Sequence, residues 1–170
     1  MARIVIDVAA QRLRVEGCAA PFSCPVSTGK AGLGSEAGSG RTPTGRFAVY
    51  SRHGENAPPM TVFRGRLPVG LWPQAAEGED AILARILVLE GMEPHNANTR
   101  ARYIYIHGTA DVERLGKPAS HGCIRLAPED MVRLFALAPI GTEVMIRPPQ
   151  PPEGGSSGHS TPCSSRAGAR

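Results

Sequence analysis

Two side chains in one short stretch could together carry out nucleophilic catalysis. His107 precedes Gly108, and Cys123 follows Gly122 sixteen residues further on. A thiol at its ordinary pKa of about 8.5 is only a few per cent thiolate at neutral pH, so a nucleophilic cysteine needs an imidazole within hydrogen-bond reach. Gly122 would let a substrate carbonyl approach the backbone, where adjacent N–H groups could stabilise an oxyanion. Spacing alone is weak evidence, because most isolated cysteines are small buried residues.

A metal or redox site built from His107, His121 and Cys123 is another interpretation of the same stretch. These residues offer no obvious fourth ligand, and the four cysteines of the chain include no CxxC pair. A zinc ribbon is therefore disfavoured. Cys18 and Cys24 could form a disulfide in an oxidising compartment, or serve as small buried residues in a reducing one.

The elements around these residues are mainly predicted strands. Residues 102–107 alternate between apolar and other side chains and predict a strand that ends at His107. Tyr105 shares the face of His107 on that strand, where it could line a cleft or simply pack. Further strands are predicted at 4–8, 13–15, 22–27, 46–50 and 142–147, whereas the Pro and Gly content of 51–70 predicts loop with short strand pieces.

Two other apolar segments have distinct patterns. Residues 81–89 could form a helix by propensity, but their short length, their β-branched content and the Gly91 and Pro94 that follow favour a buried strand. Pro128 and the two acidic residues after it suit the start of a helix. Apolar residues then recur at i, i+3, i+4 and i+7 between positions 131 and 138. The sequence thus predicts a mainly β domain with one clear helix.

The composition changes sharply after Arg147. Residues 148–170 are almost all Pro, Gly, Ser and other small or polar residues, which cannot bury enough surface to offset their ordering entropy. We therefore predict one folded domain over residues 1–147 and a disordered tail over 148–170. The 41% of hydrophobic and 20% of charged residues fit a soluble globular protein.

Charge and hydropathy limit the partners and the location. The net charge of +4 could favour anionic partners, but Lys and Arg are scattered, which argues against nucleic-acid binding. The N-terminus shows no secretory signal, and no run approaches the ~18 apolar residues that span a bilayer. The expected location is cytoplasmic as encoded, or periplasmic if the true start lies upstream or export is unconventional.

The stretch around the two candidate residues closely resembles the catalytic domain of the L,D-transpeptidase (YkuD-type) family. The matching motifs occur in the family's order at residues 4–7, 25–29, 42–47, 106–109 and 119–126. The HGT and SHGCIR motifs are together highly specific, whereas TPTG alone is not. The resemblance covers about residues 3–147 and implies a twisted mixed β-sandwich with an open catalytic cleft.

The resemblance also implies catalytic roles. Cys123 would be the nucleophile, and His107 the general base and later the general acid. The backbone carbonyl of Gly108 would hold the imidazole in position, and the N–H groups of Gly122 and Cys123 would form the oxyanion hole. No metal and no organic cofactor would be required.

Four further residues are candidates for substrate binding. His121 could orient the substrate, polarise the thiol, or be bonded to backbone beside a tight turn. Ser120 fits a loop-fixing hydroxyl better than a catalytic one. Arg125 could bind a stem carboxylate or pair with a structural acid. Tyr105 completes this set.

In that family the substrate is a peptidoglycan tetrapeptide stem whose third residue, a diamino acid, is followed by D-Ala. The thiolate attacks the carbonyl of the third residue, D-Ala leaves, and a thioester acyl-enzyme forms. An amine from another stem, or water, then resolves it. The expected outcome is L,D-transpeptidation. The alternatives are an L,D-carboxypeptidase that trims muropeptides in wall recycling and an inactive wall-binding domain. Carbapenems acylate this family and are expected inhibitors.

Overall fold

The computed structural model describes residues 2–76, 78 and 80–151 of the 170-residue chain. In chain order its elements are β1 (Arg3–Asp7), β2 (Arg12–Glu16), β3 (Phe22–Pro25), β4 (Gly45–His53), β5 (Thr61–Arg64), β6 (Leu67–Leu71), β7 (Ile82–Gly91), β8 (Tyr105–Gly108), β9 (Ile124–Leu126), α1 (Pro128–Leu137) and β10 (Glu143–Arg147), with 3₁₀ turns at Pro94–Asn96 and Val112–Arg114. Most of the predicted tail, residues 152–170, lies outside the described residues. No helix in the described part of the chain is long and apolar enough to cross a membrane.

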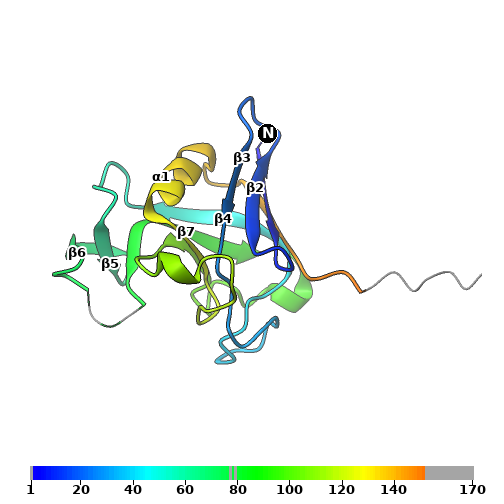
Figure 1. The fold of residues 1–170 in the computed structure, drawn as a ribbon. Coiled ribbons are helices and arrows are strands. Elements are labelled where there is room, and N and C mark those ends of the chain that lie inside the picture. The colour runs from blue at the N-terminus through cyan, green and yellow to red at the C-terminus, as the bar shows by residue number, and fades with distance from the viewer. Residues whose placement is uncertain (1, 77, 79, 152–170) are drawn as a thin grey trace, which may run out of the picture.

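The strands form one curled mixed sheet, with the β5–β6 hairpin and the β2–β3 pair at opposite ends (Figure 1). The strand order is β3-β2-β1-β10-β4-β7-β5-β6, and β8 pairs with both β7 and β9. The β1–β10 and β8–β9 pairs are parallel, and the other pairs are antiparallel. α1 packs on β7 and β8. The mainly β fold with one clear helix is confirmed.

β7 is a central strand of the sheet and pairs with three others, β4, β5 and β8. Residues 83–89 are all buried. Leu87 and Leu89 belong to the main core, whereas Ile86 and Val88 pack in a second cluster with Tyr105. Burial on both faces explains the continuous apolar run that left helix and strand open in the sequence. The preferred strand prediction is confirmed.

The helix follows its sequence signals closely. α1 begins at Pro128, with Glu129 and Asp130 in its first turn, where negative charge complements the helix dipole. Met131 and Leu134 are fully buried on its apolar face. This packing covers the sheet beside the segment that carries the HGT motif.

One sequence prediction needs correction. The strand predicted from residue 102 begins only at Tyr105, because Tyr103 adopts a left-handed conformation with φ of +57° within a turn. The segment 51–70 is loop with short strand pieces, as predicted, and these pieces are the end of β4 and most of the β5–β6 hairpin. Gly65 and Arg66 connect β5 to β6 with φ of +57° and +66°, the backbone of a tight two-residue hairpin turn.

Candidate active site

The parallel pair β8–β9 brings the two predicted catalytic residues to one face of the sheet. His107 lies opposite Arg125, and Cys123 directly precedes β9, at the position opposite Tyr105 in the same register. The residues between them, at positions 106 and 124, face the main core. Because side chains alternate along a strand, His107 and Cys123 both point away from that core. They are offset by two residue positions along the paired strands.

The imidazole of His107 is oriented by the backbone. Its side chain is buried, and Nδ1 lies 2.7 Å from the carbonyl oxygen of Gly108. A carbonyl oxygen only accepts hydrogen bonds, so Nδ1 carries the proton and Nε2 is the basic nitrogen. Burial lowers the pKa of His107, against the opposing effects of this hydrogen bond and of Asp80. The ring is therefore neutral at neutral pH.

Gly108 is required by the close approach of β7. A Cβ at this position would lie 2.6 Å from the backbone oxygen of Leu83. The β7–β8 register shifts here, and Ala84 adopts φ of +71°. This irregularity presses the backbone of β7 against β8, so the residue after His107 can carry no side chain.

The thiol of Cys123 is half-buried among backbone groups. Its Sγ accepts a hydrogen bond from the N–H of Tyr105 at 3.3 Å and lies 3.4 Å from the carbonyl oxygen of Tyr103. Burial raises the pKa of Cys123 to about 11, although the Tyr105 N–H acts in the opposite direction. The free protein thus holds a neutral thiol on the same face as a neutral imidazole.

The turn before Cys123 is fixed by the hydroxyl of Ser120. This hydroxyl donates to the carbonyl oxygen of Cys123 at 2.6 Å and accepts from the N–H of Gly122 at 3.2 Å. Ser120 is buried, and Gly122 has φ of +125°. These are the contacts of a loop-fixing hydroxyl. They also occupy the Gly122 N–H, one of the two donors that the family resemblance implies for the oxyanion hole.

The motif segments 25–29 and 42–47 hold the turn before Cys123 through hydrogen bonds. The hydroxyl of Thr42 donates to the carbonyl oxygen of Gly122 at 2.9 Å and accepts from the N–H of Gly29 at 2.8 Å. The N–H of Lys30 donates to the carbonyl oxygen of Ser120 at 2.8 Å. The motifs at 25–29 and 42–47 therefore hold the cysteine turn in place.

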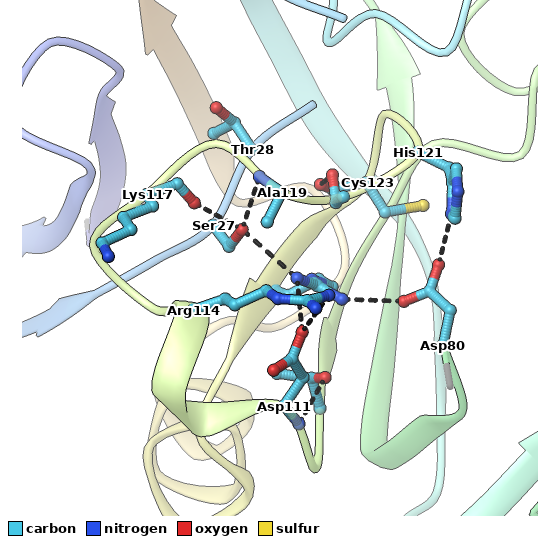
Figure 2. Close-up of polar contacts among 12 residues, drawn as sticks. Ser27, Thr28, Asp80, Asp111, Arg114, Lys117, Ala119, His121 and Cys123 are labelled. Atoms are coloured by element: carbon cyan, nitrogen blue, oxygen red, sulfur yellow. Dashed lines mark hydrogen bonds and ion pairs between the residues drawn. The ribbon is translucent and has the colours of Figure 1, made fainter. Parts of the chain in front are cut away.

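Arg125 is paired with acids beneath the turn. Its guanidinium lies 2.9 Å from Asp80 and 3.4 Å from Asp111, and the residue is 2% exposed. Asp80 also contacts His121, whose Nδ1 lies 2.8 Å from the carboxylate (Figure 2). This arrangement favours the structural-acid alternative for Arg125 over direct binding of a substrate carboxylate. His121 itself faces solvent, with 86% of its side chain exposed.

Two hollows are lined by residues that neighbour the cysteine, although Cys123 itself lines neither of them. One, of about 440 Å³, is lined by Tyr103 and Tyr105, whose backbone groups contact Sγ. The other, of about 460 Å³, is lined by Lys30, Ser120 and His121. A larger hollow of about 700 Å³ lies between the β1–β2 end and the α1–β10 connection and contains none of the predicted site residues. In the described part of the chain, no three His, Cys, Asp or Glu side chains are grouped to hold a metal ion.

Comparison with known families gives the same assignment as the motifs. Residues 1–146 match the YkuD family, described as the L,D-transpeptidase catalytic domain. The chain belongs to this L,D-transpeptidase family. Among curated relatives, it is 46% identical over 48 residues to a putative L,D-transpeptidase, YqjB, of Bacillus subtilis. That alignment covers 28% of this chain and 27% of the relative.

Solved L,D-transpeptidases share the fold. Those from Mycobacterium smegmatis and Xylanimonas cellulosilytica each align with a TM-score of 0.56, at 19% and 23% identity, and cover 86% of this chain and 58% and 60% of their own. An L,D-transpeptidase in complex with imipenem aligns with a TM-score of 0.53 at 21% identity, covering 86% of this chain and 58% of that one. The chain therefore spans less than two thirds of the length of these relatives.

Two residues that the sequence did not single out lie at this L,D-transpeptidase site. Asp80 contacts both His121 and Arg125 from a segment without any motif. Arg102 donates to the carbonyl oxygen of Arg41 at 2.7 Å and thereby ties the turn before β8 to the TPTG segment. The need of a buried Arg125 for acidic partners was the one available signal for Asp80, and it does not say which acid of the chain supplies them.

Proposed function

We propose that this chain is a cysteine-dependent enzyme that acts on peptidoglycan tetrapeptide stems. Membership of the L,D-transpeptidase family supports this substrate class. The observation that carries the proposal is the placement of Cys123 and His107 on one face of the β8–β9 pair, with Nδ1 of His107 bonded to Gly108. That bond leaves Nε2 as the nitrogen that can take the thiol proton.

The first half-reaction would form a thioester. As Sγ of Cys123 attacks the carbonyl carbon of the third stem residue, its proton passes to Nε2 of His107. The C–N bond to D-Ala then breaks, and the protonated His107 returns the proton to the departing amine. The backbone N–H of Cys123 would stabilise the oxyanion, and the N–H of Gly122 would join it if it exchanged its bond to the Ser120 hydroxyl for one to the substrate.

The second half-reaction would transfer the acyl group to an amine of another stem. One hollow lined by Tyr103 and Tyr105 and another lined by Ser120 and His121 support room near the cysteine turn for both a donor and an acceptor peptide. With water as the acceptor, the same acyl-enzyme would give an L,D-carboxypeptidase that trims tetrapeptides to tripeptides. The two outcomes differ only after the thioester has formed.

A β-lactam of the carbapenem class is the expected inhibitor. A solved relative with this fold is described in complex with imipenem. We expect a covalent adduct of one carbapenem on the wild-type chain, detected by intact mass. Because Cys123 would be the acylated residue, the adduct should be absent from Cys123→Ala.

The substrate experiment uses purified full-length protein and a disaccharide tetrapeptide, with products followed by mass spectrometry. Cross-linked dimers or exchange of D-Ala for an added D-amino acid would support transfer. Loss of D-Ala alone would identify the carboxypeptidase. A substrate left unchanged by a folded chain that also forms no carbapenem adduct would contradict both activities and indicate an inactive wall-binding domain. Cys123→Ala is the matched control.

A further inference from the structure

We propose that Asp80 is a positioning residue for the Cys123–His107 pair. Its carboxylate would fix the turn before Cys123 through His121 and hold a negative charge beside both reacting side chains. The inference rests on the proposed function, since it assigns Asp80 a part in the same cysteine chemistry. Asp80 precedes β7 and is separated from its partners by more than 40 residues of sequence.

Each carboxylate oxygen of Asp80 has a different partner, and the two partners bracket Cys123. Oδ2 lies 2.8 Å from Nδ1 of His121, two residues before the cysteine. Oδ1 accepts from Arg125, two residues after it, at 2.9 Å. In Figure 2, the sulfur of Cys123 points toward the side on which His121 and Asp80 lie. One side chain thus holds the chain on both sides of the nucleophile.

The contact with His121 restrains a residue that would otherwise be free to move. Its side chain is 86% exposed, and within the described ranges Asp80 is its only hydrogen-bond partner. A solvent-exposed ring samples several rotamers unless a partner fixes it. Thr42 and Lys30 hold the backbone of this turn through hydrogen bonds, and Asp80 holds its exposed side chain, that of His121.

The contact with Arg125 anchors Asp80 to a rigid part of the sheet. Arg125 is 2% exposed, and its backbone forms two hydrogen bonds with Ser27, each of 3.0 Å. Of the two ion pairs of Arg125, the one with Asp80 is the shorter, at 2.9 Å, compared with 3.4 Å for the one with Asp111. His121 is therefore fastened through a carboxylate to a buried cation on β9.

The charge of Asp80 acts on both reacting groups. Burial is the largest influence on each, but the Asp80 carboxylate raises the pKa of His107 and also the pKa of Cys123. Arg125 lowers the pKa of both groups, and Arg102 lowers the pKa of Cys123. Although burial acts against it, hydrogen bonds from His121 and Arg125 lower the pKa of Asp80, so the carboxylate is ionised at neutral pH.

Other titratable or charged groups near this cluster are few in the described chain. Asp111 faces Arg125 from the segment after β8, and Arg64 of β5 lines the same hollow as Asp80. Tyr103 and Tyr105 contact the sulfur through their backbone. Removal of the Asp80 charge alone should therefore move the pKa of His107 and the pKa of Cys123 in the same direction, downward.

The test measures alkylation of Cys123 by iodoacetamide as a function of pH, because this reaction needs no peptidoglycan substrate. Rates are read from the Cys123 peptide by mass spectrometry, which separates it from the other cysteines. Asp80→Asn keeps an oxygen for Arg125 but removes the charge, and Asp80→Glu keeps the charge but displaces the carboxylate. Asp111→Asn is the matched control, since it removes a charge from the same guanidinium without touching His121.

We expect two separate effects. In Asp80→Asn the rising limb of the rate profile moves to lower pH, so that the rate below the wild-type midpoint increases about threefold, because a half-unit change in pKa corresponds to that factor. In Asp80→Glu the limb stays in place, but the plateau rate changes about twofold or more, as expected when a restraint on the turn is displaced. Asp111→Asn leaves the midpoint unchanged.

Two results would overturn the proposal. One is a midpoint in folded Asp80→Asn that equals that of wild type, whatever happens to the plateau. The other is a shift of equal size in Asp111→Asn. Thermal unfolding is measured first, and if Asp80→Asn is unfolded, an unchanged plateau in Asp80→Glu overturns the proposal instead. A shifted profile in a chain that leaves tetrapeptides intact would support the role of Asp80 and contradict the proposed function alone.

Discussion

Burial gives the two reacting side chains protonation states suited to general-base catalysis. The pKa of His107 is lowered and that of Cys123 is raised to about 11, so both groups are uncharged at neutral pH. A stable thiolate–imidazolium pair is thereby disfavoured before substrate arrives. In the proposed mechanism the thiol would therefore lose its proton to His107 as it attacks, and the imidazole would be indispensable to acylation rather than an aid to it.

Replacing the base should therefore nearly abolish acylation. In His107→Gln we expect the rate of carbapenem adduct formation to fall by about 10²–10⁴-fold, the usual contribution of a general base. His95→Gln is the matched control, because His95 is exposed and its ring bonds the Thr44 carbonyl oxygen rather than a group of the Cys123–His107 pair. Intact-mass time courses provide the measurement. Equal rates in His107→Gln and His95→Gln would remove His107 from the mechanism.

The site residues that could be predicted from the sequence are those that lie in recognisable motifs. His107 and Cys123 were identified because an imidazole at a strand end and a cysteine after glycine have recognisable chemistry and occur in specific motifs. Asp80 was missed because its contacts depend on long-range strand pairing. β7, which follows Asp80, pairs with β8, and β8 pairs with β9, which carries Arg125. Nothing in the sequence around Asp80 states which distant residues it will meet.

At the element scale, the turn that carries Cys123 depends on a hydroxyl from another segment. Thr42 is fully buried and satisfies both the Gly29 N–H and the Gly122 carbonyl oxygen. In Thr42→Val, which has nearly the same shape, both backbone groups lose their partner. We expect a loss of about 2–3 kcal/mol in the free energy of unfolding, since an unsatisfied buried polar group costs about 1–3 kcal/mol.

The same substitution should also slow acylation of Cys123 by several-fold, because the turn is less well fixed. Urea unfolding and carbapenem time courses measure the two effects. Thr42→Ser keeps the hydroxyl and should restore most of both. If Thr42→Val, which keeps the methyl group and loses only the hydroxyl, were as stable and as readily acylated as wild type, the two hydrogen bonds of Thr42 would not support the turn.

The predictability of the elements followed their burial pattern. α1 was predicted within about a residue at each end, because one apolar face and clear end signals agree. β7 stayed ambiguous between strand and helix because it is buried on both faces. The β5–β6 hairpin was not predicted as such, since its turn residues Gly65 and Arg66 are not a strong hairpin signal and β6 is exposed along its length.

At the scale of the whole molecule, the fold brings four of the motif segments together at one place. β1 and β10 pair in parallel within the sheet and join the β2–β3 pair to β4, whereas residues 25–29, 42–47, 106–109 and 119–126 meet at the β8–β9 edge. Four segments scattered over about a hundred residues are thus assembled by long-range strand pairing. The order of the strands in the sheet could not be read from local patterns, and the family resemblance implied only a twisted mixed β-sandwich.

The same buried groups that define the site should shape the stability of the whole domain with pH. His107 has a lowered pKa in the folded state, so below its ordinary pKa of about 6.5 the unfolded chain binds more protons and stability is lost as the pH falls. Burial raises the pKa of Cys24 to about 12 and that of Cys123 to about 11. Unfolded thiols ionise near pH ~8.5, so stability is also lost as the pH rises beyond that value.

Stability should therefore be highest between about pH 6.5 and pH 8.5, the window between the unfolded-state pKa values of the histidine and the thiols. Chemical denaturation at pH values below, within and above this window measures it. His107→Gln should reduce the loss on the acid side, to which His53 with its lowered pKa also contributes, and Cys24→Ala should remove the share of the alkaline loss that Cys24 contributes beside Cys123. An alkaline loss that persists unchanged when both Cys24 and Cys123 are replaced by alanine would show that ionisation of the buried thiols does not limit the folded state.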